Sequence, residues 1–121
     1  MRYQLKTAVA LVLACSVGQA FAAGALAIDH NQGDQYGFSY DYAQMRDAEQ
    51  RAIDECGSNC QVVVRFNRGC AAYAADQTLG STLYGWAIQD SEQAAQQRAL
   101  LECTSRGGER CMIRVWACES N

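Results

Sequence analysis

Six cysteines recur in two matched blocks, and this repeat constrains the fold more than any other feature of the chain. In each block, one cysteine ends a helical segment, a second begins an apolar strand and a third ends that strand. The blocks run from Ala48 to Cys70 and from Ala95 to Cys118. The cysteines are Cys56, Cys60, Cys70, Cys103, Cys111 and Cys118. The repeat predicts how the chain is built, but it indicates no reaction.

The repeat extends upstream, where two matched segments precede each helix. These segments are 25–29 and 36–38 in the first block, and 72–76 and 84–86 in the second. We therefore predict an α+β fold with two pseudo-symmetric strand–strand–helix–strand units, at about 24–70 and 71–118. Units this small do not build separate cores, so we expect one disulfide-stapled domain.

Residues 1–22 have the pattern of a secretory signal peptide. Positive residues precede a short apolar stretch, and an A-x-A motif ends at Ala22. The predicted mature domain is 23–121, periplasmic or secreted, with no transmembrane segment left after cleavage. The alternative is a lipoprotein anchored through Cys15, because the residues before it loosely resemble a lipidation motif.

The composition of the predicted mature chain narrows its partners. It has eight arginines, no lysine and 13 acidic residues, a net charge of −5. A net acidic domain is a poor nucleic-acid binder, so we expect no nucleic acid as partner. Six cysteines in an exported chain indicate three disulfides. Zinc binding is the alternative, but there is no C-x-x-C pair and His30 is the only histidine. We expect no metal and no cofactor.

Six cysteines allow 15 connectivities, and the repeat favours one of them. It suggests equivalent bonds from helix end to strand start, with the strand-end cysteines left to pair across the units. These bonds are Cys56–Cys60, Cys103–Cys111 and Cys70–Cys118. The first is the weak point, because its three intervening residues must turn tightly.

The helices and strands have readable local signals. Asp41 and Asp90 each begin a capping-box-like pattern, which predicts helix starts there. The apolar positions of the two helices are Met45, Ala48, Ala52, Ile53 and Cys56, and Ala95, Ala99, Leu100 and Cys103. In the last strand of each unit, alternation predicts one inward face, made of Val62, Val64 and Phe66, and of Ile113, Val115 and Ala117. Residues 67–69 resemble a hairpin turn.

Several segments resemble a bacterial family, domain of unknown function 4189. They are GALAI, the aromatic–glycine–aromatic step, AEQRAIDEC, CQVVVRFNRGCAAYA and CMIRVWAC. The resemblance covers the chain from about Gly24 to Cys118. It implies an exported α+β domain, and it carries over no catalytic residue.

Candidate catalytic groups are few. His30 lies beside Asp29 and near Asp34, and a His–Asp pair can act as a general base. We favour a solvated loop histidine, because no nucleophile motif accompanies it, and a cysteine nucleophile is excluded if all six are bonded. We therefore predict no catalytic residue.

Arginines and aromatic residues are the candidate binding groups. The helix arginines have glutamates four residues later, which predicts the ion pairs Arg51–Glu55 and Arg98–Glu102. Arg65 and Arg114 lie within the matching strands, and an arginine patch for an acidic partner is the sharper alternative. The aromatic stripe is either core or, if exposed, a surface for a glycan or a protein. Its residues are Tyr36, Phe38, Tyr84 and Trp86.

These features favour a non-enzymatic binding or interaction module with an unknown protein or glycan partner. A periplasmic inhibitor or immunity-type protein is one concrete form. The alternative is a small envelope hydrolase acting on glycan or cell-wall material, which a cleft that brings His30 together with two carboxylates would favour.

Overall fold

The computed structural model describes residues 22–29 and 35–119, and eight elements cover most of them. The first unit contains β1 (Ala23–Asp29), β2 (Tyr36–Tyr42), α1 (Met45–Cys56) and β3 (Cys60–Phe66). The second contains β4 (Gly69–Asp76), β5 (Tyr84–Gln89), α2 (Glu92–Ser105) and β6 (Cys111–Glu119). The two predicted strand–strand–helix–strand units are confirmed, with their boundary at 67–68 rather than after residue 70.

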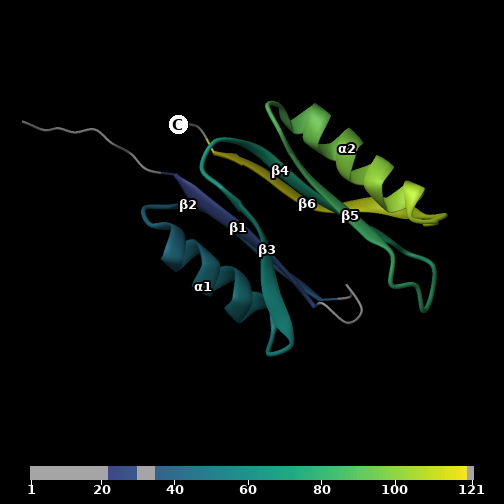
Figure 1. The fold of residues 1–121 in the computed structure, drawn as a ribbon, viewed down its shortest axis with the longest axis horizontal. Coiled ribbons are helices and arrows are strands. Elements are labelled where there is room, and N and C mark those ends of the chain that lie inside the picture. The colour runs from purple at the N-terminus through teal and green to yellow at the C-terminus, as the bar shows by residue number, and fades with distance from the viewer. Residues whose placement is uncertain (1–21, 30–34, 120–121) are drawn as a thin grey trace, which may run out of the picture.

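Each unit forms its own three-stranded antiparallel sheet, in the order β2-β1-β3 and β5-β4-β6. The first strand of each unit is therefore the central strand of its sheet. The sheets pack face to face, with α1 and α2 on the outer sides (Figure 1). The result is four layers, helix–sheet–sheet–helix, with one core between the sheets and one under each helix.

The core between the sheets holds the large side chains. Leu26 and Ile28 of β1 face Tyr73 of β4, and all three are fully buried. The Tyr73 ring centroid lies 5.1 Å from that of Tyr36 and 6.1 Å from that of Tyr84. Both sheets therefore bury large apolar side chains in one shared core, so the two repeats fold as one body.

The core under each helix is built from small residues. Alternate residues of β1 and β4 are alanines, and they pack on buried alanines of α1 and α2. Gly37 and Gly85 stand where the helices come closest, because a Cβ there would overlap backbone atoms of the helix. The glycine of the aromatic–glycine–aromatic step thus serves the helix contact, while its aromatic neighbours face the other sheet.

The predicted single face of the last strands is wrong in one respect. A β-bulge interrupts the register where Val63 is skipped in β3 and Arg114 in β6. Before the bulge, Val62 of β3 and Ile113 of β6 pack toward the helices. After the bulge, Val64 of β3 and Val115 of β6 face the opposite sheet. The bulge shifts the alternation by one residue, so both strands contribute to two cores.

The predicted helix starts are corrected as well. α1 begins at Met45, and its N-cap, Gln44, makes no side-chain capping bond. Asp41 has a left-handed φ of 65° and belongs to the end of β2 instead. In α2 the cap is Ser91, whose hydroxyl accepts from the Ala94 N–H, one residue beyond the predicted Asp90.

The predicted hairpin at 67–69 is also wrong. β3 and β4 belong to different sheets, so this turn carries the chain from one sheet to the other. Gly69 has a φ of 77°, which fits the expected role of glycine in the turn.

Candidate functional site

All six cysteines of the described residues form disulfides, with the predicted pairing Cys56–Cys60, Cys103–Cys111 and Cys70–Cys118. One part of the prediction is wrong, because Cys70–Cys118 joins β4 to β6 inside the second sheet and does not cross the units. The tight Cys56–Cys60 bond spans Cα atoms 6.0 Å apart. These sulfurs are therefore engaged with one another and are not free thiolates for a metal or for nucleophilic attack.

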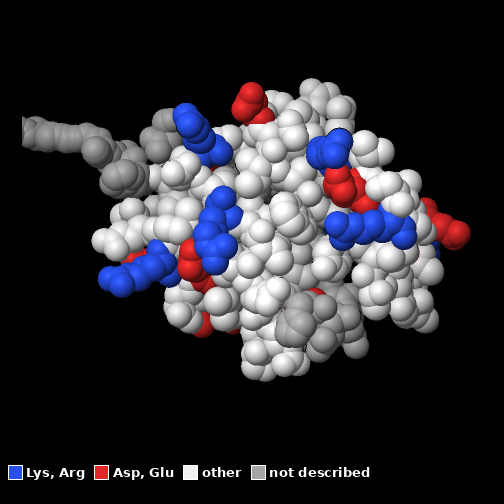
Figure 2. Space-filling model, in the orientation of Figure 1, with Lys and Arg blue, Asp and Glu red and all other residues white. Residues whose placement is uncertain are grey.

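The helix arginines are engaged within the fold. The predicted pairs are confirmed, with N···O distances of 2.9 Å for Arg51–Glu55 and 2.8 Å for Arg98–Glu102. Arg65 pairs with a glutamate of α1. On the face shown in Figure 2, positive and negative side chains lie next to one another on both flanks, and the middle is uncharged. The arginine-patch alternative thus rests on Arg114.

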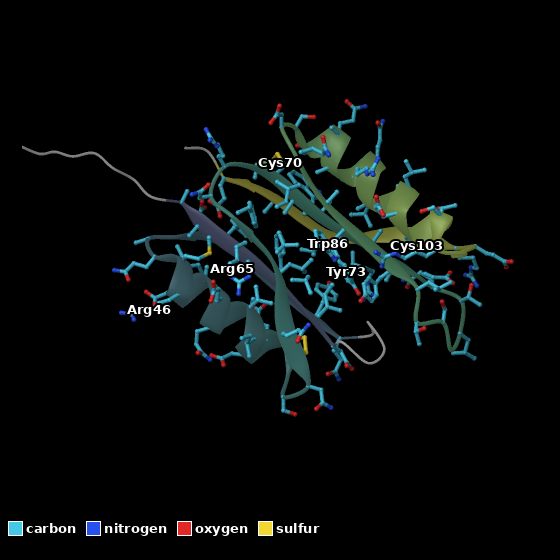
Figure 3. All side chains as sticks on the ribbon, in the orientation of Figure 1. Arg46, Arg65, Cys70, Tyr73, Trp86 and Cys103 are labelled. Carbon is cyan, nitrogen blue, oxygen red and sulfur yellow. A yellow bond between two sulfur atoms is a disulfide. The ribbon has the colours of Figure 1, made fainter. Side chains whose placement is uncertain are left out.

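The aromatic candidates line the core between the sheets. Phe38 is 8% exposed, and Tyr36, Tyr84 and Trp86 are partly buried against the same cluster. Figure 3 shows Tyr73 and Trp86 between the sheets. These side chains hold the two units together, and their binding role stays a prediction.

The loop between β4 and β5 is organised by one carboxylate. Asp76 Oδ1 accepts from the Thr78 N–H at 3.2 Å, the Thr78 hydroxyl at 2.9 Å and the Arg110 N–H at 2.9 Å. A hydrogen bond from Ser81, together with these, lowers the pKa of Asp76 from 3.8 to about 2. Asp76 therefore stays ionised at neutral pH and ties this loop to the segment before β6.

The tip of this loop presents an apolar side chain. The Ser81 N–H donates to the Thr78 carbonyl oxygen at 2.9 Å, which closes a β-turn. Gly80 has a φ of 83° at the third turn position, where glycine is favoured. Leu79 precedes it and is 99% exposed, the most exposed of the large apolar side chains in the described part of the chain.

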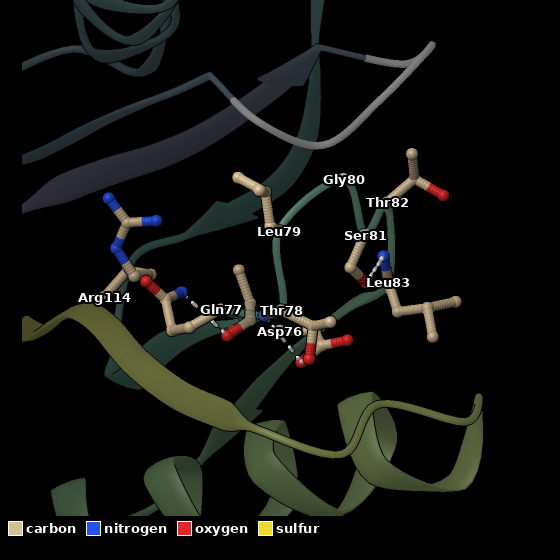
Figure 4. Close-up of a pocket in the computed structure, with 10 residues that line it drawn as sticks. Asp76, Gln77, Thr78, Leu79, Gly80, Ser81, Thr82, Leu83 and Arg114 are labelled. Atoms are coloured by element: carbon tan, nitrogen blue, oxygen red, sulfur yellow. Dashed lines mark hydrogen bonds between the residues drawn. The ribbon is translucent and has the colours of Figure 1, made fainter.

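A cavity of about 420 Å³ lies beside this loop. It is lined by residues 75–83 and by Arg114 of β6. Figure 4 shows Arg114 and Leu79 facing the same hollow from β6 and from the loop. The Arg114 guanidinium carbon lies 5.3 Å from the ring centroid of Tyr36, and the Tyr36 hydroxyl donates to the Arg114 carbonyl oxygen at 3.5 Å. The cavity therefore belongs to the second unit, and its residue Arg114 contacts the first unit through Tyr36.

A buried carboxyl group lies at the other end of β6. Glu119 is 3% exposed, and its Oε2 accepts from the Asp41 N–H at 2.8 Å. Its Oε1 has no hydrogen-bond partner among the described residues. Burial, and secondly the neighbouring Asp41 carboxyl, raises the pKa of Glu119. This contact links β2 to β6 and lies outside the cavity.

Several sequence predictions fall outside the described residues. They concern His30 and Asp34, the signal peptide and the alternative lipid site Cys15. Among the described residues, no cluster of three or more potential ligands could hold a metal ion. In residues 22–29 and 35–119, no helix is long and apolar enough to cross a membrane.

The family follows from the sequence match. The profile described as Domain of unknown function (DUF4189) matches residues 23–118. The chain belongs to the DUF4189 family. No curated protein and no solved structure matches it. For this DUF4189 chain, the candidate site therefore rests on its own geometry.

Arg114 was among the residues predicted from the sequence, whereas Leu79 was not. The signal was present in the Thr78-Leu79-Gly80-Ser81 segment, since a turn with glycine in third place presents its second residue outward.

Proposed function

We propose that this chain is an exported, disulfide-stabilised binding or interaction module without catalytic activity. A periplasmic inhibitor or immunity-type protein remains one concrete form. The observation that carries the proposal is Leu79, which is 99% exposed on a hydrogen-bonded loop beside the cavity. Isolated exposed apolar residues are common, so the weight lies in the combination of apolar tip, cavity and ordered loop.

The ordered loop favours binding because it lowers the entropy that association costs. Asp76 and Ser81 hold the loop through hydrogen bonds to its own backbone, and Asp76 also ties it to Arg110. The turn holds the Leu79 side chain in water, and removing that apolar surface from water on contact with a partner would favour association.

The hydrolase alternative finds less support in this cavity. A general acid or base works best with a pKa near the working pH. Asp76, the carboxylate in the lining, has its pKa lowered to about 2 and is occupied by hydrogen bonds. These properties suit a structural carboxylate, which is why we place binding first.

Export is part of the proposal. The disulfides fit an oxidising compartment, and the family match begins at residue 23, where the predicted mature chain begins. Intact-mass measurement of the protein from the periplasm or medium should give a chain that starts at Ala23. A chain that starts at a lipid-modified Cys15 would instead show that the protein is a membrane-anchored lipoprotein.

The binding test uses two exposed leucines. Leu79→Ser removes the loop tip, and Leu101→Ser is the matched control on α2, where Leu101 is 55% exposed. Oxidised protein, purified with each substitution, is compared in quantitative partner capture from envelope extract. We expect at least a tenfold loss of one stoichiometric partner with Leu79→Ser and no loss with Leu101→Ser.

Equal capture by both variants would reject the loop as the binding surface. Turnover of a glycan or cell-wall substrate by the purified protein would reject the non-enzymatic class. Both variants change fully exposed or half-exposed side chains, so thermal unfolding should confirm that the fold is intact.

A further inference from the structure

The bulge in β6 determines which way the Arg114 side chain points. The skipped register position turns it toward the first sheet, where its guanidinium stacks on Tyr36. The strand and helix arginines described above pair with glutamates, but among the described residues Arg114 forms no ion pair. Stacking orients a guanidinium and leaves its edge free, and that edge is the part that binds oxyanions in pairs of hydrogen bonds.

The rest of the cavity offers donors beside that edge. Gln77 gives one amide N–H to the Ala75 carbonyl oxygen at 3.1 Å, which leaves its second N–H. Thr82 is also among the residues that line the cavity. Asp76, the single lining carboxylate, accepts hydrogen bonds from Thr78 and Arg110 through Oδ1. The charge of Asp76 still opposes an anion, so the affinity for a small probe should be weak.

We infer that this cavity binds an anionic oxygen group, a carboxylate or a phosphate, with Arg114 as the paired hydrogen-bond donor. The inference rests on the proposed binding function and names the chemistry that the site recognises in a partner or ligand. A volume of about 420 Å³ suits one such group with its immediate substituents. Leu79 would then contact the apolar part of the same molecule.

The test titrates the oxidised protein, labelled with nitrogen-15, with acetate, inorganic phosphate and acetamide in separate series. Acetamide resembles acetate in shape but carries no charge. We expect saturable shifts of the amides at 76–83 and of the Arg114 Nε–H with acetate or phosphate, and none with acetamide. Whichever anion gives the tighter binding distinguishes the carboxylate source from the phosphate source.

Arg106 provides a matched control for the variants. Its guanidinium carbon lies 5.4 Å from the Tyr84 ring centroid, but it donates to the Tyr84 carbonyl oxygen and lies outside the cavity. Arg114→Gln should weaken anion binding at least tenfold, and Arg106→Gln should leave it unchanged. Arg114→Lys should bind in between, because an ammonium has charge but no paired donors.

The inference is overturned if acetamide binds as well as acetate, if no anion binds, or if Arg114→Gln binds like the parent. Its failure is separable from that of the proposed function. Partner capture that is lost with Leu79→Ser but kept with Arg114→Gln keeps the binding function and rejects the anion site. A retained two-dimensional spectrum for Arg114→Gln ensures that unfolding is not the cause of any loss.

Discussion

The second unit carries two disulfides where the first carries one, although both units have the same four elements. The additional bond, Cys70–Cys118, joins the central strand β4 to β6. The repeat places Ala23 and Asn67 at the equivalent positions of the first unit. Because the Asp76 loop leaves β4 and Arg114 lies on β6, the additional bond cross-links the two strands that frame the cavity.

The units also differ at the bulge itself. Arg114 occupies the skipped position of β6, and Val63 occupies the equivalent position of β3. Val63 packs against the core between the sheets, whereas Arg114 reaches the cavity. The repeat therefore supplies one scaffold twice, and the exchange of one side chain at a bulge gives the second copy a charged site where the first has core.

The largest expected effect concerns the disulfides. Replacing Cys70 and Cys118 by alanine should lower the free energy of unfolding by about 4 kcal/mol, because that bond closes 48 residues. Removing Cys56–Cys60, which closes only four residues, should cost about 2 kcal/mol. Denaturant unfolding of the two double variants measures both. An equal or larger loss of stability on removing Cys56–Cys60 would contradict the view that the second unit is the more strongly cross-linked of the two.

The next effect concerns the two helix-facing glycines. Gly37→Ala and Gly85→Ala each place a methyl group against helix backbone, which cannot rotate away. Each should lower the free energy of unfolding by about 3 kcal/mol, through overpacking of a tight core. Gly37→Ala should lower the free energy of unfolding more than Gly85→Ala, because the first unit has one disulfide and the second has two. Gln89→Ala, an exposed change on β5, is the control for strand substitutions.

A small effect of Gly37→Ala, below that of Gly85→Ala, would show that α1 moves more freely than its packing suggests. Hydrogen exchange of α1 and α2 amides would then reveal whether the first helix already opens locally in the parent protein.

The fold was predictable because its signals are periodic. Helix faces depend on local spacing, and the structure buries Ala48 and Ala52 of α1 as that spacing predicts. The disulfide pairing followed from the repeat, since equivalent cysteines occupy equivalent places in two copies of one unit. Periodicity and repetition are properties of the sequence itself, so no tertiary contact is needed to read them.

The errors arose where distant contacts decide the outcome. Asp41 does not cap α1, because it lies in β2 with a left-handed φ of 65°, and there its N–H donates to Glu119, 78 residues away. The bulge at Val63 lies in a run of valines that are apolar on either face, so the sequence could not indicate the shift. The Arg114 orientation depends on such a bulge, and its stacking partner Tyr36 belongs to the other unit. The candidate site was thus predictable only as separate residues.

Helix capping gives a smaller test of the comparison. Ser91→Ala should destabilise the protein by about 1 kcal/mol, because the Ala94 N–H loses its acceptor. Gln44→Ser should stabilise it by about 0.5 kcal/mol, because Gln44 has extended N-cap geometry and makes no capping bond. Thermal unfolding of both variants measures the changes. If Gln44→Ser has no effect, the first turn of α1 is frayed, and the two helix starts then differ in order as well as in their capping bonds.

The last comparison concerns the pH dependence of stability, which two carboxyl groups should influence in opposite directions because their pKa values shift in opposite directions. The pKa of Asp76 is lowered to about 2, so its contribution to stability is present above 3.8 and is lost as the pH falls through about 2. The pKa of Glu119 is raised from 4.5, so its contribution is complete below that value and is lost as the pH rises through the folded-state pKa.

Glu119→Gln should therefore remove a loss of stability that develops above about pH 4.5, where the unfolded chain ionises Glu119 more readily than the folded protein, which buries that carboxyl group with an unpartnered Oε1. Asp76→Asn should do the reverse, with a deficit at neutral pH that disappears toward about pH 2. Melting temperatures of the parent and both variants across this pH range separate the two. A constant offset for Glu119→Gln at all pH values would mean that Glu119 does not titrate between the sheets. In that case its bond to Asp41 joins the two units as an ordinary charged contact, and Asp76 rather than Glu119 accounts for the pH dependence that these variants test.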